Sequence, residues 1–516
     1  SLVSVVWQFG TLQLLGYGLD PLAVLVPFLV FAIGVSHGVQ QINYIAKEVC
    51  SGVDTPTAAR RSFSGLLIPG TMALVTAFVG FATLVLIPIP MIRELAITAA
   101  IGVAYKIVTN LVMLPVAASY LRFDDRYVAR VNQLRERRGG WMGVLGRIAE
   151  PRHAAVGALV CVALFALAWW QSQGRHIGHL QPGAPELRAE SRYNRDATHI
   201  VEKFDVGLDV LSVVVETPKD GCYDHATMEY LNQFGWQMAN VPGVVSVASA
   251  AWLAKQAFSG FNEGNPKWAA LLRDLKSLAN AVGLAPEGSG LTNPGCTVMP
   301  VHLYLADHKA TTVKAVTAAV EAFRREHRAD GVTVRLASGN VGVQAATNEV
   351  LQRTELPMML YVYATILVLV LVTYRDWRAM LACCLPLTLA TLLGYWFMKV
   401  LDIGLTVATL PVMVLAVGIG VDYAFYIYNR LQLHLAQGVD IVAAFKQSLR
   451  ETGIATIFTA LTLSVGVATW SFSELKFQAD MGLLLTFMFM INMLMAITLL
   501  PALAVMIDVL IPRRQP

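Results

Sequence analysis

The chain has 516 residues, of which 56% are hydrophobic and only 14% are charged. Soluble domains hold roughly 45 to 50% apolar residues, so this composition excludes an ordinary soluble protein and indicates several membrane spans. The net charge of +4 is small and gives no reason to expect a nucleic-acid partner.

Apolar stretches long enough to cross a bilayer recur along the chain, since about 20 residues suffice for a spanning helix. Residues 1–17 are typical of the end of a span, and complete spans are expected over 21–45, 66–87, 95–121, 154–170, 356–374, 379–400, 405–430, 453–473 and 481–510. Residues 122–152 hold eight arginines against four acids, which places this segment in the cytoplasm by the positive-inside rule. That assignment orients every other span.

The spans divide the chain into membrane and soluble parts. We expect a membrane bundle over 1–121, a basic cytoplasmic linker over 122–152, a transmembrane helix over 153–171, an extracytoplasmic domain over 172–354, a second membrane bundle over 355–511 and a cytoplasmic tail over 512–516. The predicted fold class is therefore a polytopic α-helical membrane protein with a duplicated helix bundle and one large soluble domain.

Within the soluble domain a strand–helix–strand pattern occurs twice. Strands are predicted over 211–216, 244–248, 301–305 and 332–336, with helices over 225–240 and 309–328. Two such β-α-β units predict an α+β, ferredoxin-like layer. The stretch 252–284 is expected to be helical, and a helix over 341–355 is expected to run directly into the span at Leu356.

Two of the six cysteines, Cys222 and Cys296, fall in the soluble domain. In an oxidising compartment they could form a disulfide, and the alternative is two free thiols. The disulfide is the interpretation we favour.

The two bundles are related by an internal repeat with an offset of 386 residues (420 − 34). The offset pairs Gly34-Val35 with Gly420-Val421, and Leu114-Pro115 with Leu500-Pro501, without a gap. Chance apolar similarity does not give so long an ungapped register, so the pattern predicts two parallel copies of one bundle. The first copy lacks its opening, and we expect the full protein to carry a further leading span, a second soluble domain and one more span.

The apolar run Leu410–Arg430 is long enough to span a bilayer, and Asp422 is the one acid within it. A carboxylate at the centre of such a helix costs roughly 2.5 to 3.5 kcal/mol to insert. We interpret Asp422 as a group that handles a proton, against the alternative of a structural polar contact between helices. Gly418 and Gly420 in this run, and Gly34 in the first repeat, are expected to allow close helix packing.

Together with the stretches Gly420-Val-Asp422-Tyr423 and Tyr428-Asn-Arg430, the duplicated plan resembles the MMPL-type, hydrophobe-exporter branch of the resistance-nodulation-division (RND) superfamily. The resemblance implies export of lipids or other hydrophobic or amphiphilic compounds, driven by the proton gradient, by a homo-oligomer that is a trimer or smaller. It also implies a bacterial inner-membrane location, with the soluble domain on the periplasmic side and a periplasmic partner within reach.

In the family that the chain resembles, an Asp in each half, often followed by Tyr, forms a proton relay. Asp422 and Tyr423 match that pattern in the second half, but Ser36 and His37 occupy the equivalent positions in the first. His37 could supply the missing titratable group, because the unperturbed pKa of histidine, about 6.5, lies near physiological pH. The alternative is a core histidine with satisfied hydrogen bonds.

Lys106 is a second charged residue in the middle of a predicted span, and its repeat partner is Asn492. A buried lysine needs a counter-charge or loses its proton, and we expect Asp422 to supply that charge. Snorkelling of the lysine to the membrane surface is the alternative. The predicted relay therefore comprises Asp422, Lys106 and His37, with Tyr423 and Ser36 as hydrogen-bonding neighbours.

The sequence has no Walker phosphate loop and no zinc-ligand spacing, so no ATP-driven pump, metal site, enzyme activity or cofactor is predicted. Two other functions of the same architecture stay open, namely a sterol- or lipid-sensing receptor-like protein and an auxiliary subunit of protein export.

Overall fold

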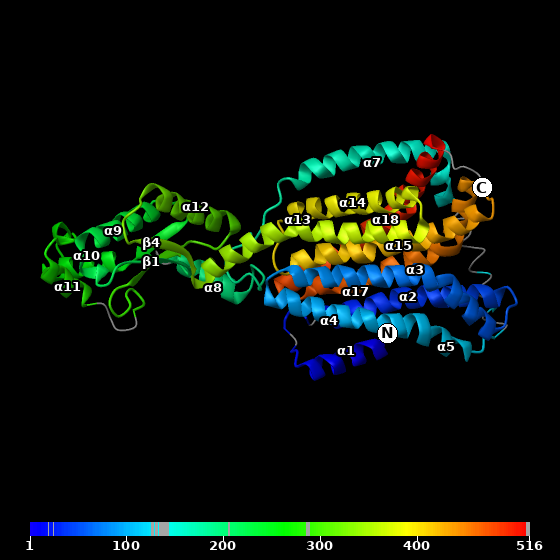
Figure 1. Cartoon of the computed structure of the whole chain (residues 1–516), viewed down its shortest axis with the longest axis horizontal. Helices are drawn as coiled ribbons and strands as arrows, with labels where there is room; N and C mark the ends of the chain where they lie inside the picture. The colour runs from blue at the N-terminus through cyan, green and yellow to red at the C-terminus, as the bar shows by residue number, and fades with distance from the viewer. Residues whose placement is uncertain are drawn as a thin grey trace.

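The computed structural model describes residues 1–18, 20–23, 25–124, 128, 129, 133, 144–204, 207–284 and 289–511. A helix bundle lies at one end of its long axis and a smaller α+β domain at the other (Figure 1). Most of the basic linker predicted over 122–152, and the tail over 512–516, lie outside the described residues.

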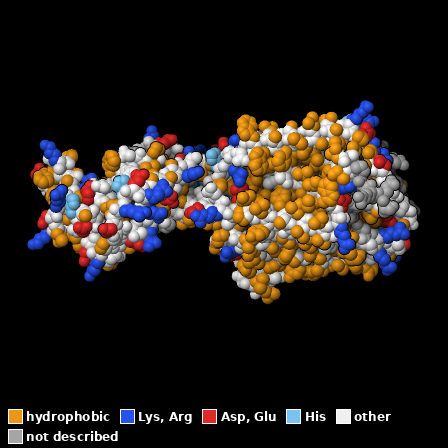
Figure 2. Space-filling view, turned by 45° about the horizontal axis from the view of Figure 1, so that its top comes forward, with side chains coloured by type: hydrophobic (Ala, Val, Ile, Leu, Met, Phe, Trp, Pro, Cys, Tyr) orange, Lys and Arg blue, Asp and Glu red, His pale blue; other side chains and the backbone are white. Residues whose placement is uncertain are grey.

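Within the described residues, nine helical stretches are long and apolar enough to cross a membrane. Figure 2 shows hydrophobic side chains covering the visible face of the bundle in a broad band, with charged side chains gathered at its two ends. The chain is therefore a multi-pass membrane protein. The nine stretches are Leu25–Cys50, Thr55–Leu86, Pro90–Ser119, Pro151–Ser172, Gly339–Tyr374, Trp377–Val400, Thr409–Ala436, Ile441–Phe472 and Lys476–Leu510.

The helices of the bundle fall into two sets. The first set is α1 (Leu2–Leu15), α2 (Leu25–Cys50), α3 (Thr55–Thr83), α4 (Pro90–Lys106), a π-helical stretch (Ile107–Met113) and α5 (Leu114–Ser119). The second set is α13 (Gly339–Tyr374), α14 (Trp377–Val400), α15 (Thr409–Ala436), α16 (Ile441–Ser448), α17 (Ile454–Ala468) and α18 (Lys476–Leu510). α7 (Pro151–Ser172) packs on α14 and α18 at the outside of the bundle (Figure 1).

The starts of the helices follow the repeat. An offset of 386 residues carries the start of α3 onto that of α16 and the start of α4 onto that of α18. α3 begins at Thr55, before the predicted start at Leu66, because Asp54 caps it by accepting a hydrogen bond from the Thr57 backbone N–H at 3.1 Å.

The soluble domain is built on a four-stranded antiparallel sheet of order β2-β3-β1-β4. Its strands are Asp209–Glu216 (β1), Val244–Ala248 (β2), Val298–Leu305 (β3) and Thr333–Ser338 (β4). α9 (His225–Ala239) joins β1 to β2 and α12 (Ala310–Glu326) joins β3 to β4, which is the predicted ferredoxin-like arrangement. The Phe234 and Phe323 rings, 5.0 Å apart, bring these two helices together over the sheet.

The helix predicted over 252–284 is interrupted. It is replaced by α10 (Ala250–Phe261) and α11 (Leu275–Val282), with irregular chain and a short 3₁₀ turn between them. Gly264 takes a left-handed φ of +74°, and Pro266 follows it, so the helix cannot continue through this segment.

A disulfide joins Cys222 to Cys296, with Cα atoms 5.5 Å apart. It closes a loop over a sequence separation of 74 residues. Loop-closure entropy for a loop of that size contributes about 4 kcal/mol to the free energy of unfolding. Of the two alternatives for these cysteines, the structure therefore contains the disulfide.

The helix α13 and the loop that follows α7 connect the soluble domain to the bundle. α13 is a single helix of 36 residues that leaves the sheet and continues through the bundle, in agreement with the prediction for 341–355. The loop between α7 and α8 (Arg192–Lys203) forms backbone bridges from Ile177 to Leu405 and from Leu187 to Leu475. The two bundle loops that hold these partners are thereby tied to the soluble domain.

Candidate functional site

α15 lies in the middle of the bundle, in contact with α3 of the first repeat and with α14 and α18 of the second (Figure 1). Every residue from Thr409 to Tyr428 is buried, as expected for a helix that is apolar on all sides. Gly418 faces α3, and a Cβ there would be in ordinary contact with the Thr76 carbonyl oxygen at 3.8 Å, so this approach does not require a glycine. Asp422 sits inside this enclosed run and is only 2% exposed.

Among the described residues, the carboxyl group of Asp422 has no ion-pair partner. Its Oδ1 is buried without a hydrogen-bond partner, and among the described residues no basic side-chain nitrogen lies within 4.0 Å of it. The hydroxyl of the adjacent Tyr423 is likewise buried without a partner. An ionised carboxylate is far more costly in such surroundings than the protonated acid. The position therefore suits a group that binds and releases a proton.

His37 of α2 meets α15 at Tyr426. The two rings are edge-on, with centroids 6.1 Å apart. His37 Nδ1 lies 3.0 Å from the Ile33 carbonyl oxygen, and its buried Nε2 has no partner. Ser36 is buried in the same turn of α2. Sequence reasoning missed Tyr426, although a residue four positions after Asp422 shares its helix face.

Lys106 does not form the predicted ion pair with Asp422. Its amine donates a hydrogen bond to the Ser1 backbone carbonyl at 3.2 Å and packs over Gly34 of α2. The lysine is fully buried, so it does not snorkel. The ion pair was expected because a buried lysine needs a counter-charge. It does not form because the packing of α4 on α1 and α2 keeps this amine within the first repeat.

One helix crossing occurs in both repeats: α4 packs on α2 in the first, and α18 packs on α15 in the second. Asn492 lies over Gly420 as Lys106 lies over Gly34, and neither glycine has room for a Cβ. Asn492 donates a hydrogen bond to the Ala416 carbonyl oxygen at 3.2 Å. The offset of 386 residues relates Gly34 to Gly420 and Lys106 to Asn492. The contact therefore has a cation in the first repeat and a neutral amide in the second.

A second acid, Glu451, lies between α16 and α17, at the end of the bundle away from the soluble domain. Its carboxylate is 3.0 Å from the Lys47 amine, 3.0 Å from Arg430 Nε and 3.7 Å from His434 Nε2. The Arg430 guanidinium also lies 5.1 Å from the centre of the Tyr44 ring. Because Lys47 and Tyr44 belong to α2, this cluster joins the two repeats.

A third acid, Glu355, lies where α13 enters the bundle and is 5% exposed. Its carboxylate is 3.0 Å from Arg175 Nη2, and the same guanidinium lies 4.7 Å from the centre of the Tyr395 ring. The sequence singles out Asp422, and the structure adds Glu355 and Glu451 as further buried or half-buried acids of the bundle. Glu355 and Glu451 each have a cation from a distant segment, which no local sequence pattern signals, whereas none of the described cations pairs with Asp422.

A duplicated helix bundle with a central buried acid and a ferredoxin-like domain defines a membrane protein of the RND class. The sequence profile of the MMPL family matches residues 182–514, so the chain belongs to the MMPL family, as the sequence resemblance predicts. It is similar to the putative membrane protein MJ1562 of Methanocaldococcus jannaschii, with 29% identity over 27% of this chain and 36% of that protein. It is also similar to the probable transport protein MmpL8 of Mycobacterium bovis, with 25% identity over 35% of this chain and 17% of that protein.

Among solved structures, the chain resembles SecDF in its super-membrane-facing form. The TM-score is 0.54 with 13% sequence identity, over 98% of this chain and 57% of SecDF. The likeness concerns the fold. The chain thus matches only part of the length of these larger proteins.

Proposed function

We propose that this chain works as a proton-motive-force-driven exporter of lipids or other hydrophobic or amphiphilic compounds, in which Asp422 carries the proton. The observation that supports this most is the contrast among the three buried acids. Glu355 and Glu451 are paired with cations, whereas Asp422, in a helix enclosed on all sides, has no such partner in the part of the chain that the structure describes. Membership of the MMPL family and the similarity to a probable transport protein add support.

Loss of the proton would leave a carboxylate in the contact between the repeats. That charge is costly unless water or a polar side chain reaches it, so the packing of α15 on α3 and α18 must change. The groups placed to respond are the Tyr423 hydroxyl, which has no partner, and the His37–Tyr426 contact. Because α13 and the loop after α7 tie the bundle to the soluble domain, a shift between the repeats is passed on to that domain.

The orientation and assembly follow from the same proposal. The soluble domain faces the periplasm of a bacterial inner membrane, and the functional unit is a homo-oligomer, a trimer or smaller, with a periplasmic partner. The arginine-rich segment 122–152 supports the orientation through the positive-inside rule.

The test uses the full-length protein in liposomes with an imposed pH gradient, an NBD-labelled phospholipid as transported probe and entrapped pyranine as proton indicator. We expect Asp422→Asn to lower gradient-driven movement of both by at least about 100-fold, equivalent to about 2.7 kcal/mol of activation free energy. Glu474→Gln is the matched control, because Glu474 is an exposed acid in the loop before α18. Equal export by Asp422→Asn and the unmodified protein would contradict the proposed function.

A further inference from the structure

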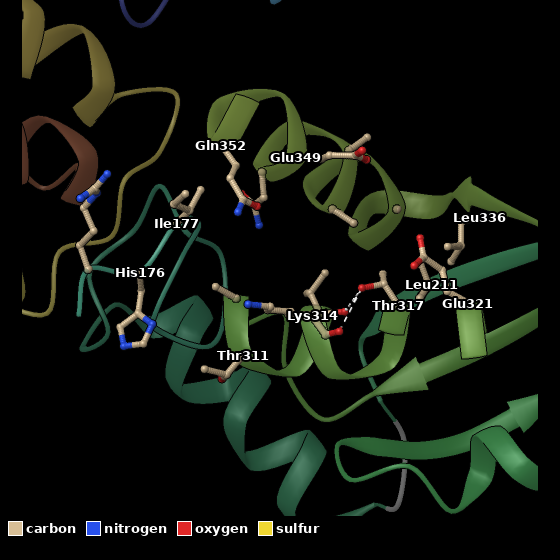
Figure 3. A pocket seen from close by; sticks show the side chains of 17 residues that line it. His176, Ile177, Leu211, Thr311, Lys314, Thr317, Glu321, Leu336, Glu349 and Gln352 are labelled. Atoms are coloured by element: carbon tan, nitrogen blue, oxygen red, sulfur yellow. Dashed lines mark hydrogen bonds between the residues drawn. The ribbon is translucent and has the colours of Figure 1, made fainter. Parts of the chain in front are cut away.

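A cavity of about 440 Å³ lies where the soluble domain meets the bundle. Its walls are α12, the first turns of α13 and the residues that follow α7 (Figure 3). The volume is in the range of small-molecule sites, which combine apolar walls with a few polar groups that fix orientation. This cavity has both kinds of wall.

One end of the cavity is open and is lined by the exposed side chains of His176, Lys314 and Gln352. Figure 3 shows Lys314 extending from α12 and Gln352 from α13 toward the same space, with His176 on the same side. Within the described part of the chain, neither the Lys314 amine nor the Gln352 carboxamide has a hydrogen-bond or ion-pair partner. α12 begins at this end, so the partial positive charge of its N-terminus adds to that of Lys314.

The charges on the remaining wall do not cancel that of Lys314. Arg175 is paired with Glu355, and Glu349 with Arg353. Glu321 lies two turns along α12 from Lys314, about 10 Å away, and Figure 3 places it at the opposite end of the cavity. The end near Lys314 is therefore cationic.

Apolar side chains continue from the cationic end toward the sheet. They are contributed by Ile177, Val313, Leu336 and Ala346. A second cavity, of about 490 Å³, lies beside α8. In its lining Asp307 is paired with Lys309 and Asp209 with His308, and Glu186 and Glu202 are further acids. An anionic ligand would be repelled there and attracted at Lys314.

The cationic end also lies close to the ends of two spanning helices, α7 and α13. α7 ends at Ser172, just before Arg175, and carries the exposed Trp169 and Trp170, which are typical of a membrane interface. Gln352 lies one turn before Glu355 and the entry of α13 into the bundle. A head group in the leaflet on the soluble-domain side could reach this end without leaving the membrane surface.

We infer that this cavity binds an anionic amphiphile, with its phosphate or carboxylate at Lys314 and Gln352 and its alkyl chain along the apolar wall toward Leu336. The inference rests on the proposed function, for which it names the substrate class. Lys314 and Gln352 select the head group, and the apolar wall distinguishes a lipid from a free anion.

The test is equilibrium binding of radiolabelled dodecyl phosphate to the full-length protein in phosphatidylcholine nanodiscs, without a gradient. We expect Lys314→Met, which keeps the aliphatic stem, to weaken binding about tenfold, as for the loss of a hydrogen bond to a charged group. Arg324→Met, on an exposed part of α12 outside the cavity, should bind as the unmodified protein does. Ala346→Trp should abolish binding by filling the cavity.

Competition separates the sources of the signal. Inorganic phosphate and dodecyltrimethylammonium, at the concentration at which unlabelled dodecyl phosphate competes, should leave binding intact. Competition by inorganic phosphate would show that the cavity binds any anion, and competition by dodecyltrimethylammonium would show that the signal comes from partitioning of alkyl chains. Equal binding by Lys314→Met and the unmodified protein would show that Lys314 does not bind the head group. Each of these results would overturn the inference. Asp422→Asn should bind normally, so a failure here and a failure of proton coupling are distinguishable.

Discussion

The two repeats have the same helix crossings and different chemistry at them. α15 is enclosed along its length up to Tyr428, whereas α2 has partly exposed positions such as Phe31. Asp422-Tyr423 in the second repeat stands opposite Ser36-His37 in the first. Asn492 packs over Gly420 in the second repeat, and Lys106 packs over Gly34 in the first.

The same divergence is found at the end away from the soluble domain. Arg430 and Glu451 form an ion pair in the second repeat, and their equivalents in the first are Tyr44 and Gly65. Tyr44 packs against Gly65, leaving no room for a Cβ there, and its ring also receives the Arg430 guanidinium. The two repeats thus share these backbone contacts, whereas Ser36 and Gly65 of the first repeat stand where the second has the carboxylates of Asp422 and Glu451.

The largest effect is expected when the second repeat receives the residue that the first has at the position equivalent to Asp422. Asp422→Ser gives the second repeat the residue of the first, and we expect gradient-driven transport to fall by at least about 100-fold because no group is left at the centre of α15 to carry the proton. Ser36→Ala should change transport by no more than about twofold. Both are measured in the proton-gradient liposome assay. An equal loss in the two variants would place the proton site between the repeats and contradict the assignment to the second.

The fold could largely be predicted from the sequence, and the contacts between repeats could not. Periodicity and apolar length located the spans and the ferredoxin-like strands, and the offset of 386 residues located the equivalent glycines. Asp422 stood out because its insertion cost depends on its own helix alone. Partner choice depends on packing between segments far apart in the chain, which is why the sequence misassigned the partner of Lys106 and missed those of Glu355 and Glu451.

The glycine crossings allow a smaller test. Gly420→Ala would drive a methyl group into the short Asn492 side chain, whereas at Gly34 the atoms in the way are the flexible end of Lys106 and the Ser1 hydroxyl. We expect a loss of about 2 kcal/mol in the free energy of unfolding for Gly420→Ala and a smaller loss for Gly34→Ala, measured by denaturant unfolding in detergent. Asn492→Ala in the Gly420→Ala background should recover part of the loss. No recovery would mean that the clash is with the backbone and that the crossings are not equivalent.

The smallest expected effect is that of replacing Lys106, and it tests whether the charge of this lysine takes part in proton transport. Lys106→Asn installs the residue of the second repeat, where Asn492 donates to the Ala416 carbonyl; the equivalent acceptor in the first repeat is the carbonyl of Val30. Among the described residues the buried lysine amine has one hydrogen-bond acceptor, the neutral Ser1 carbonyl, so the substitution should leave the free energy of unfolding unchanged or raise it by about 1 kcal/mol. Gradient-driven transport should stay within about twofold, because the structure holds this amine against α2 and away from any ion pair with Asp422. A loss as large as that of Asp422→Asn would mean that the lysine pairs with Asp422 in another state of the cycle, and the two repeats would then share the proton pathway.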